Sequence, residues 1–273
     1  GVTVTAGVPT VWLALLAHLN KTGKTVPSLR RVIVGGSACP QAIMEEFERK
    51  HGVHVHHAWG MTEMSPIGTF NSPSADFATL SREEQWAQRV RVGRPVFGVE
   101  VKIVDAAGEE LPWDGVSFGA LKVRGPWICS EYFRIGKGDA HDDDGWFETG
   151  DVATVDRRGY VAITDRTKDV IKSGGEWISS IDLENTAVAH PAVAEAAVIG
   201  AYHPRWAERP LLCAVLHPGA QLTREELLAW FEGKVAKWWI PDDVVFVDEL
   251  PHTATGKLSK KDLRERMKDY RFP

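Results

Sequence analysis

The sequence predicts an α/β fold, more fully an α+β protein of two domains, and three observations lead to this prediction. Residues 1–80 alternate between apolar positions at helix spacing and at strand spacing. Residues 92–164 contain short alternating strands with turns between them, and residues 167–273 mix strand and helix patterns. The chain has 273 residues, of which 44% are hydrophobic, so it is long enough for one large domain or two smaller ones.

The first 80 residues predict alternating strands and helices. A short apolar run ends in Gly35-Gly36, and Pro40 then suits the first turn of a helix. A glycine-bearing link between strand and helix is typical of the ligand-facing edge of an α/β sheet. Strands are predicted at residues 1–5, 31–34 and 53–57, and helices at residues 9–19 and 40–50.

The rest of the chain predicts a β-rich region and then a separate small unit. We place the boundary between residues 166 and 167, giving domains 1–166 and 167–273. The first of these contains the α/β region of residues 1–80 and the β-rich region of residues 92–164. Further strands are predicted at residues 99–103, 120–123, 151–155, 160–164, 196–200, 211–216 and 244–247, and helices at residues 181–189, 224–232 and 260–267.

Composition narrows the classes of function. A formal net charge of -5 argues against non-specific nucleic-acid binding, which needs a broad basic surface, so no nucleic-acid partner is expected. Three widely spaced cysteines suit a reducing compartment, and no apolar run reaches membrane-spanning length. We therefore expect a cytoplasmic protein without a transmembrane segment. The chain starts without Met, which predicts that it is part of a longer polypeptide.

Two segments of the α/β region carry groups suited to nucleotide binding. The small residues 35–40 would let a planar ligand approach the backbone, although taken alone they favour an ordinary strand-to-helix turn. In residues 57–63, the Trp59 ring can stack on a purine, a contact worth roughly 1–3 kcal/mol per base. Thr62 and Glu63 offer oxygen ligands of the kind that Mg²⁺ with phosphates prefers. The alternative is a strand end with a buried Trp and a Thr-Glu helix start.

Two later segments carry a carboxylate and a set of cations. Asp151, at the end of residues 145–151, could accept hydrogen bonds from ribose hydroxyls. Arg166, Lys168 and Lys172 place three cations in seven positions, which indicates an anion nearby or a solvated polar turn. Lys257 follows a glycine in a loop of small residues and could reach a phosphate as a mobile point charge. A surface turn before a basic helix is the alternative for that loop.

Three weaker signals favour structural roles. His54 and His56 share one strand face but lack a carboxylate or Cys partner at ligand spacing, so a polar strand edge is the better interpretation than a metal site. Residues 142–145 resemble only a fragment of a calcium loop. Trp238-Trp239 beside Lys234 and Lys237 favours packing at a domain edge over contact with a membrane or a partner.

The order of these motifs resembles the adenylate-forming superfamily, which contains acyl-CoA synthetases, firefly-type luciferases and peptide-synthetase adenylation domains. The resemblance rests on Trp-Gly-Met-Thr-Glu at 59–63, Gly-Trp-Phe-Glu-Thr-Gly-Asp at 145–151, the stretch 165–180 and Thr-Gly-Lys at 255–257. Residues 165–185 most resemble medium- and long-chain fatty acyl-CoA synthetases and their methylthiopropionate-activating relatives. The implied fold is the remainder of a large α/β plus β-barrel-like N-terminal domain, followed by a small mobile α+β domain.

The family's Ser/Thr/Gly-rich phosphate loop occurs nowhere in this sequence. We therefore expect an N-terminally truncated acyl-CoA synthetase, or one partner of a split enzyme, that is inactive by itself. The resemblance implies ATP, Mg²⁺ and coenzyme A as cofactor and co-substrates and a small carboxylic acid as substrate. The oligomeric state cannot be predicted from the sequence, and a homodimer is one option. The sequence does not identify the acid, because the resemblance implies that most residues of the acid-binding pocket lie in the family's N-terminal half.

The resemblance also implies roles for particular residues. Lys257 would bridge the carboxylate and the α-phosphate, Lys168 would be the hinge, and Lys172 would belong to the loop presented for thioester formation; these three form the implied catalytic set. Glu63 would hold Mg²⁺. The implied nucleotide- and cofactor-binding residues are Gly36, Ser37, Ala38, His57, Ala58, Trp59, Gly60, Thr62, Asp151, Ile163, Arg166, Gly174, Gly175 and Trp177.

Two other classes of function remain open on the sequence. One is an adenylating enzyme that delivers its acyl group to a carrier-protein thiol, or oxidises it as luciferases do. The run Lys-Ser-Gly-Gly-Glu-Trp at 172–177 favours free coenzyme A by analogy with relatives. The other is a fragment that binds nucleotide without activity of its own.

Overall fold

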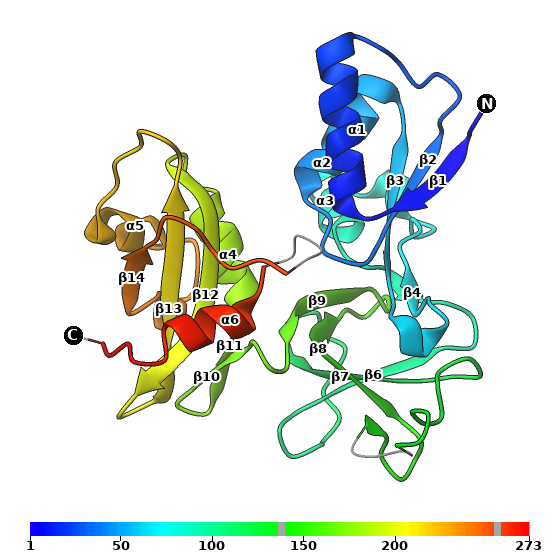
Figure 1. Ribbon diagram of the computed structural model, residues 1–273. Helices are drawn as coiled ribbons and strands as arrows, with labels where there is room; N and C mark the ends of the chain where they lie inside the picture. Colours follow the sequence, from blue (N-terminus) through cyan, green and yellow to red (C-terminus); the bar gives the residue numbers. More distant parts are fainter. Residues whose placement is uncertain (136–139, 254–257, 273) are drawn as a thin grey trace. The chain divides into compact units, whose positions relative to one another are not determined.

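The computed structural model describes residues 1–135, 140–253 and 258–272. They fall into two compact units, residues 1–163 and residues 164–273 (Figure 1). The predicted boundary after residue 166 lies slightly later than this division. Each unit has its own sheets and its own hydrophobic clusters, and each is described separately below.

The first unit begins with a five-stranded sheet in the order β1-β2-β3-β4-β5. The first three strands are parallel, and the two short ones that follow are antiparallel to their neighbours. The apolar faces of two helices supply the core, which includes Trp12 and Leu16 from one helix and Met44 and Phe47 from the other. The elements are β1 (Val4–Gly7), α1 (Pro9–Thr22), β2 (Arg31–Val34), α2 (Gln41–His51), β3 (His54–Trp59), β4 (Thr69–Phe70), α3 (Arg82–Arg89) and β5 (Arg94–Pro95).

Local sequence signals set the ends of these helices. Pro9 opens α1, where the missing N–H costs nothing, and Gly23 closes it in a left-handed conformation with its N–H on the Leu19 carbonyl. Gly52 ends α2 in the same way. Ser81 and Glu84 form a reciprocal capping box at the start of α3. The glycine at residue 23 explains why α1 continues to Thr22, beyond the end predicted at residue 19.

The β-rich part of the first unit is an antiparallel four-stranded sheet. Its order is β6-β7-β8-β9, formed by Glu100–Val104, Phe118–Arg124, Phe147–Val155 and Val161–Arg166. The barrel-like element implied by the resemblance is wrong for this chain. In the part of the chain that the structure describes, β6 and β9 do not pair with each other, and the sheet stays open.

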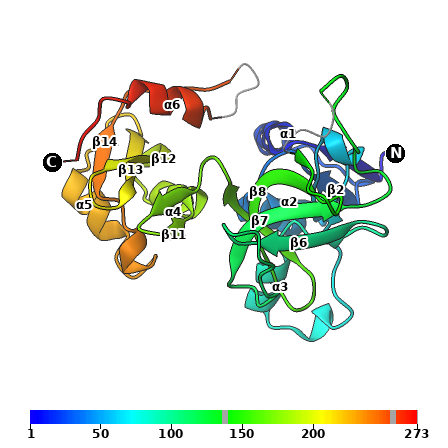
Figure 2. The same ribbon diagram turned by 90° about the horizontal axis from the view of Figure 1, so that it is seen from below.

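The second unit is a sheet covered by helices on both faces. Strands β10 (Ile171–Ser173), β11 (Glu176–Ile178), β12 (Val193–His203), β13 (Ala207–Leu216) and β14 (Asp243–Phe246) take the order β11-β10-β13-β12, with β14 paired to β13. Alternate residues of β12 and β13 enter different clusters, because successive strand residues point to opposite faces. Helices α4 (Ser180–Val188) and α5 (Arg224–Trp230) cover one face, and α6 (Lys260–Arg266) covers the other (Figure 2).

The predicted longer elements are confirmed, and their ends shift by a few residues. The predicted strand at 211–216 extends to Ala207–Leu216, and the predicted helix at 40–50 starts one residue later at Gln41. The sequence did not indicate β4, β5, β10 or β11. Strands of two or three residues are too short to show an alternating pattern, so only pairing with a neighbouring strand creates them.

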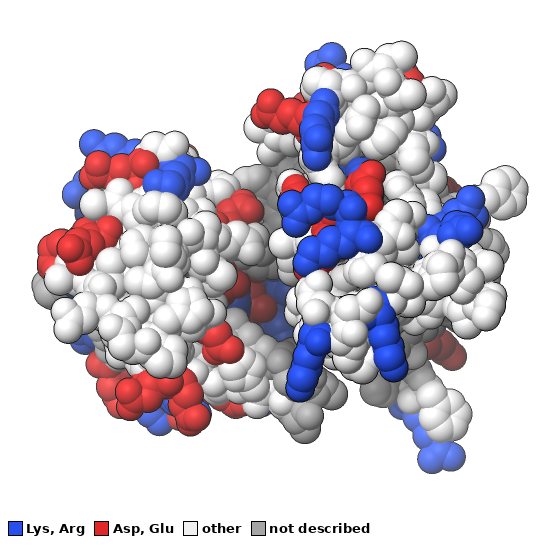
Figure 3. All heavy atoms as spheres, turned by 90° about the horizontal axis from the view of Figure 1, so that it is seen from above, with Lys and Arg blue, Asp and Glu red and all other residues white. Residues whose placement is uncertain are grey.

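The surface offers no continuous basic field on the face drawn in Figure 3. There, Lys and Arg side chains stand in separate groups among acidic and uncharged residues. Among the described residues, no helix combines the length and the apolar character that a membrane crossing needs.

Candidate functional site

The glycine link after β2 lies beside the end of β3. Val34 pairs with His57 in the parallel ladder, so residues 35–38 leave the sheet next to residues 57–60. A Cβ at Gly35 would lie 3.1 Å from the Ala58 carbonyl oxygen, and Gly36 has a φ of 81°. Glycine is therefore needed for this close backbone approach. The predicted residues Gly36, Ser37 and Ala38 are exposed along this edge.

The buried side chain of His57 contacts the backbone next to this edge of the sheet. Its side chain is buried, and its Nδ1 lies 3.1 Å from the Val90 carbonyl oxygen. The ring also meets the backbone at Ser37 and Arg91, while burial lowers the pKa of His57. His57 thus links the glycine segment after β2 to the backbone that follows α3.

The structure brings Trp59 and Asp151 into direct contact. The Trp59 indole Nε1 donates to Asp151 Oδ2 at 2.8 Å, although the two residues are 92 positions apart. Asp151 lies on β8 and is 6% exposed, and its N–H donates to Thr149 Oγ1 at 3.1 Å. Ile163 and Trp59 pack against the same hydrophobic cluster. Trp59 and Asp151, from two distant segments, are therefore in direct contact, and Ile163 shares a hydrophobic cluster with Trp59.

Two glycines let the chain fold back under Trp59. A Cβ at Gly60 would lie 1.9 Å from the Pro66 carbonyl oxygen, which no side chain could tolerate. A Cβ at Gly68 would lie 2.7 Å from the Trp59 ring. Between these glycines, the single-turn helix Thr62–Met64 buries Met64 and leaves Thr62 exposed. The predicted Gly60 is thus needed for the loop's shape.

Glu63 is held by a loop that the sequence did not associate with it. Its Oε1 accepts a hydrogen bond from the Tyr132 hydroxyl at 2.8 Å, and its carbonyl oxygen accepts one from the Cys129 N–H at 2.8 Å. The bond to Glu63 raises the pKa of Tyr132 to about 12. Nothing in the spacing of Tyr132 marks it as a partner of Glu63, because the two residues lie in loops far apart in the sequence.

The oxygens of Thr62 and Glu63 suit a magnesium ion that arrives with a nucleotide. Mg²⁺ is commonly held by one or two carboxylates together with substrate phosphates and water. Among the described residues, no group of three or more His, Cys, Asp or Glu side chains could form a separate metal cage. A carboxylate such as Glu63 is a donor of the kind that such a magnesium takes, and its role as the ligand stays a prediction.

The predicted residues of the second unit lie on a hairpin and on the turn before it. Lys172 and Trp177 pair across β10 and β11, and the turn between them is Gly174-Gly175, with φ of 61° and 91°. Two successive positive φ values are typical of a tight hairpin turn and favour glycine. Lys168 lies in the preceding turn, where its carbonyl oxygen accepts a hydrogen bond at 3.0 Å from Arg264 of α6.

A buried charged cluster includes Asp165, which lies just before the predicted hinge residue Lys168. Asp165 accepts hydrogen bonds from the N–H and hydroxyl of Ser180, and Lys260 of α6 pairs with Glu184 of α4 at 2.8 Å. Burial raises the pKa of Asp165 and of Glu184. The cluster fixes residue 165 to α4 and α6. Arg166 is exposed, and Lys257 lies outside the described residues.

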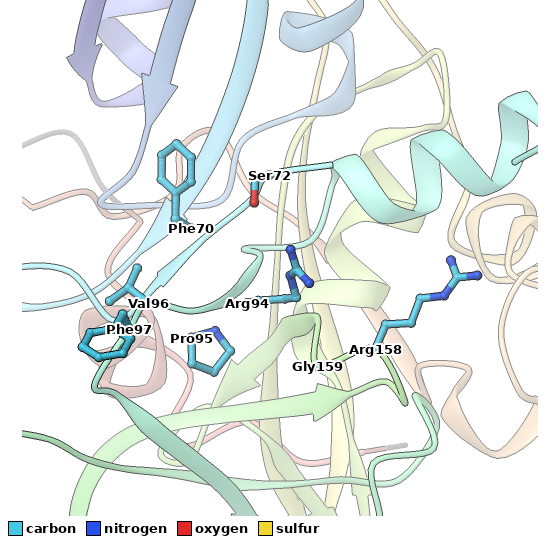
Figure 4. A pocket seen from close by; sticks show the side chains of 8 residues that line it. All are labelled: Phe70, Ser72, Arg94, Pro95, Val96, Phe97, Arg158 and Gly159. Atoms are coloured by element: carbon cyan, nitrogen blue, oxygen red, sulfur yellow. The ribbon is translucent and has the colours of Figure 1, made fainter. Parts of the chain in front are cut away.

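A pocket of about 520 Å³ in the first unit contains none of the predicted site residues. Figure 4 shows Phe70, Val96 and Phe97 on one side of it and Arg94 and Arg158 on the other. It also includes Ser72, Pro95 and Gly159. This pocket is therefore separate from the predicted nucleotide-binding residues of the first unit.

The comparisons with known proteins agree with the motif order. Residues 1–133 match the model of the AMP-binding enzyme family, and residues 182–257 match that of the AMP-binding enzyme C-terminal domain. The chain therefore belongs to the adenylate-forming superfamily of AMP-binding enzymes.

Its relatives include acyl-CoA ligases. The chain is 56% identical, over 98% of its length, to a 3-methylmercaptopropionyl-CoA ligase of Ruegeria lacuscaerulensis. It is 52% identical, also over 98% of its length, to a medium-chain-fatty-acid–CoA ligase of Ectopseudomonas oleovorans. These matches cover 50% and 49% of the two relatives, so the chain spans about half the length of the curated relatives it matches.

Solved structures show the same fold. ATP-bound MatB from Rhodopseudomonas palustris matches with a TM-score of 0.81 at 33% identity, over 98% of this chain and 51% of that one. The o-succinylbenzoate CoA synthetase of Bacillus subtilis, in complex with its acyl-adenylate, matches with a TM-score of 0.79 at 32% identity, over 99% of this chain and 52% of that one.

Replacing Trp59 by Phe tests the contact with Asp151. The change keeps a ring but removes the indole N–H, and a hydrogen bond to a charged group contributes about 1.5–3 kcal/mol. We expect the free energy of unfolding to fall by roughly that amount, measured by urea denaturation. Trp113→Phe alters an indole that is 38% exposed and is the matched control. Equal stability of Trp59→Phe and the wild type would contradict the assigned contact.

Acid should destabilise the first unit through its buried histidines. Burial lowers the pKa of His54 to about 4 and also lowers that of His57, whereas an unfolded histidine titrates near pH 6.5. The unfolded state therefore binds protons first, so stability is complete above about pH 6.5 and falls as the pH approaches 4. Urea midpoints across this range measure the loss. His54→Gln should reduce it, and His18→Gln, at an exposed position of α1, should not.

Proposed function

We propose that the protein carrying this chain is an ATP-dependent acyl-CoA synthetase. The observation that supports this most directly is the identity of more than half of the aligned residues with CoA ligases over 98% of the chain. The contact between Trp59 and Asp151 adds a geometric reason, because the two residues come from separate segments.

The proposed reaction has two half-reactions. First, a carboxylate oxygen of the acid attacks the α-phosphorus of ATP, the bond to pyrophosphate breaks, and acyl-AMP forms. Then the sulfur of coenzyme A attacks the acyl carbon, the thiol loses its proton, and AMP leaves with the bonding electrons. Acid, ATP and coenzyme A thus become acyl-CoA, AMP and pyrophosphate.

The residues of the first unit would hold the nucleotide. The backbone of residues 36–38 would approach the adenine, with Ala58 and Trp59 covering the base. Asp151 would accept hydrogen bonds from the ribose, and Thr62 would contact the α-phosphate. Magnesium bound at Glu63 would supply positive charge to the phosphates. Tyr132 would keep the Glu63 carboxylate oriented through the 2.8 Å hydrogen bond.

The residues of the second unit would serve both steps. Arg166 would bind the ribose, and Lys257 would meet the negative charge that builds up during adenylation. Lys168 would be the hinge, and the segment Lys172–Trp177, with Gly174 and Gly175 at its turn, would accompany the thioester step. Asp165, just before Lys168, is bonded to Ser180, and the Lys168 carbonyl oxygen is bonded to Arg264, so the chain around Lys168 packs within the second unit.

The acid is best sought among methylthio and medium-chain fatty acids, on which the similar ligases are named. The test is pyrophosphate release and acyl-CoA formation by the complete protein that contains this sequence, over a panel centred on 3-methylmercaptopropionate and medium-chain acids. Absence of acyl-AMP with every acid would contradict the proposal. Transfer of the acyl group to a carrier protein, but not to free coenzyme A, would favour the alternative adenylating enzyme.

A cytoplasmic location and a homodimer stay predictions. Light scattering of the purified complete protein tests the dimer. Calorimetry with AMP and with coenzyme A on residues 1–273 tests whether this chain binds either ligand by itself.

Lys257→Ala should abolish adenylation in the complete protein. Preorganised charge aimed at developing charge is a large catalytic contribution, and removing one such group typically costs about 10²–10³ in rate. Thioester formation from supplied acyl-AMP should be largely unchanged. Quenched-flow measurement of the two half-reactions distinguishes these outcomes, with Lys261→Ala as the matched lysine control. Equal loss in both half-reactions would refute this role for Lys257.

Lys168→Pro should have the opposite effect. Proline fixes φ near -65° and so removes the freedom that a hinge residue needs. We expect acyl-AMP to form at a rate near that of the wild type and to accumulate on the enzyme, because the thioester step is blocked. Rapid quench with chromatography of the adenylate measures this. Normal acyl-CoA turnover by the variant would remove Lys168 from the hinge.

A further inference from the structure

Residues 206–209 form hydrogen bonds with three consecutive residues of the β10–β11 hairpin, two through its backbone and one through a side chain. The Lys172 N–H donates to Glu208 Oε2 at 2.9 Å, and the Gly174 N–H donates to the Trp206 carbonyl oxygen at 3.0 Å. Between them, the Ser173 hydroxyl oxygen accepts a hydrogen bond from the Arg209 guanidinium at 3.2 Å. The hairpin is therefore anchored to residues 206–209 as well as by its own two strands.

Arg209 joins this anchor to a third segment. Its Nε donates to Asp242 Oδ1 at 2.8 Å, and its other nitrogens donate to the Trp238 carbonyl oxygen at 2.9 Å and to the Ile240 carbonyl oxygen at 3.3 Å. The guanidinium also lies over the Trp238 ring, 4.2 Å from its centre. The side chain is only 6% exposed. A planar guanidinium can satisfy all these acceptors at once, which a lysine ammonium cannot.

The indole rings of Trp206 and Trp238 pack against one side of the Gly174-Gly175 turn. The Trp206 and Trp238 rings meet edge to face, with centres 4.9 Å apart. A Cβ at Gly174 would lie 3.0 Å from the Trp206 ring and 3.7 Å from the Trp238 ring. A Cβ at Gly175 would meet nothing within 4 Å. The turn is thus packed on the Gly174 side and open on the Gly175 side.

We propose that Arg209, with Glu208 and the Trp206–Trp238 pair, is a positioning residue that fixes this turn for attack by the thiol of coenzyme A. The proposal rests on the acyl-CoA synthetase function proposed above. A turn that positions the thiol of coenzyme A for attack needs a fixed backbone. Displacement of a reacting group by about 1 Å can lower the rate by 10²-fold. Arg209 itself is buried beneath the turn and acts through Ser173.

The test separates the two half-reactions in the complete protein. For Arg209→Met, which keeps apolar bulk, we expect thioester formation from supplied acyl-AMP to slow by about 10²-fold. Adenylation should stay close to the wild-type rate. Arg209→Lys should recover part of the loss, because the ammonium restores a positive charge and hydrogen-bond donors but not the planar geometry of the guanidinium. Arg271→Met is the control, since Arg271 donates to the Lys268 and Tyr270 carbonyl oxygens and contacts neither the hairpin nor Asp242 in the printed bonds of the described residues.

Hydrogen exchange gives a measurement that does not depend on coenzyme A. The amides of Lys172 and Gly174 should exchange faster in Arg209→Met, and the Lys172 amide faster in Glu208→Ala, than in the wild type or in Arg271→Met. Unchanged exchange, or equal slowing of both half-reactions in a folded variant, would overturn the positioning role. If Arg209→Met does not fold, Glu208→Ala must show the same selective thioester defect, and an unselective defect refutes the proposal.

The same data distinguish failure of the inference from failure of the proposed function. If the protein makes no acyl-CoA with any acid, but exchange at Lys172 and Gly174 still depends on Arg209, then the assigned function is wrong and the structural anchor is real. If acyl-CoA forms normally in Arg209→Met, the function stands and the positioning role is wrong.

Discussion

The hydrogen bond from the Trp59 indole to the Asp151 carboxylate is the interaction on which the candidate nucleotide site depends. It links the end of a parallel α/β sheet to a strand of an antiparallel sheet, at 2.8 Å and largely out of solvent. A carboxylate in such a place is stable only with donors around it. The bond also fixes the plane of the Trp59 ring, so the aromatic surface and the carboxylate keep one relative orientation. Gly60 and Gly68 make this arrangement sterically possible.

The second unit relies on buried charge in two places. Around residue 165, Asp165, Glu184 and Lys260 neutralise one another between α4 and α6. Beneath the hairpin, Arg209 is paired with Asp242 and caps carbonyl groups. Buried charges are strongly destabilising when a partner is lost, and this gives each cluster a defined geometry. Both clusters lie next to backbone that the proposed mechanism uses, the hinge in one case and the glycine turn in the other.

Much of the fold could be predicted from the sequence. Helix boundaries followed Pro9, Gly23 and Gly52, because these residues act through their own backbone preferences. Strands of four residues or more could be predicted from apolar or alternating residues in the sequence. The hairpin at residues 171–178 did not, since its strands have three residues each, and the barrel expectation failed because closure depends on pairing between strands distant in the sequence.

The sequence by itself determined the family, the order of the motifs and the residue types available for nucleotide chemistry, because these are carried by short local segments. Only the tertiary structure decided which of them meet. It joined Trp59 to Asp151, supplied Tyr132 as the partner of Glu63, and placed Arg209 beneath the Lys172–Trp177 hairpin. Such contacts depend on the register of strands and the packing of loops far apart in the chain. They follow from the minimum of the whole molecule's free energy, which local patterns do not encode.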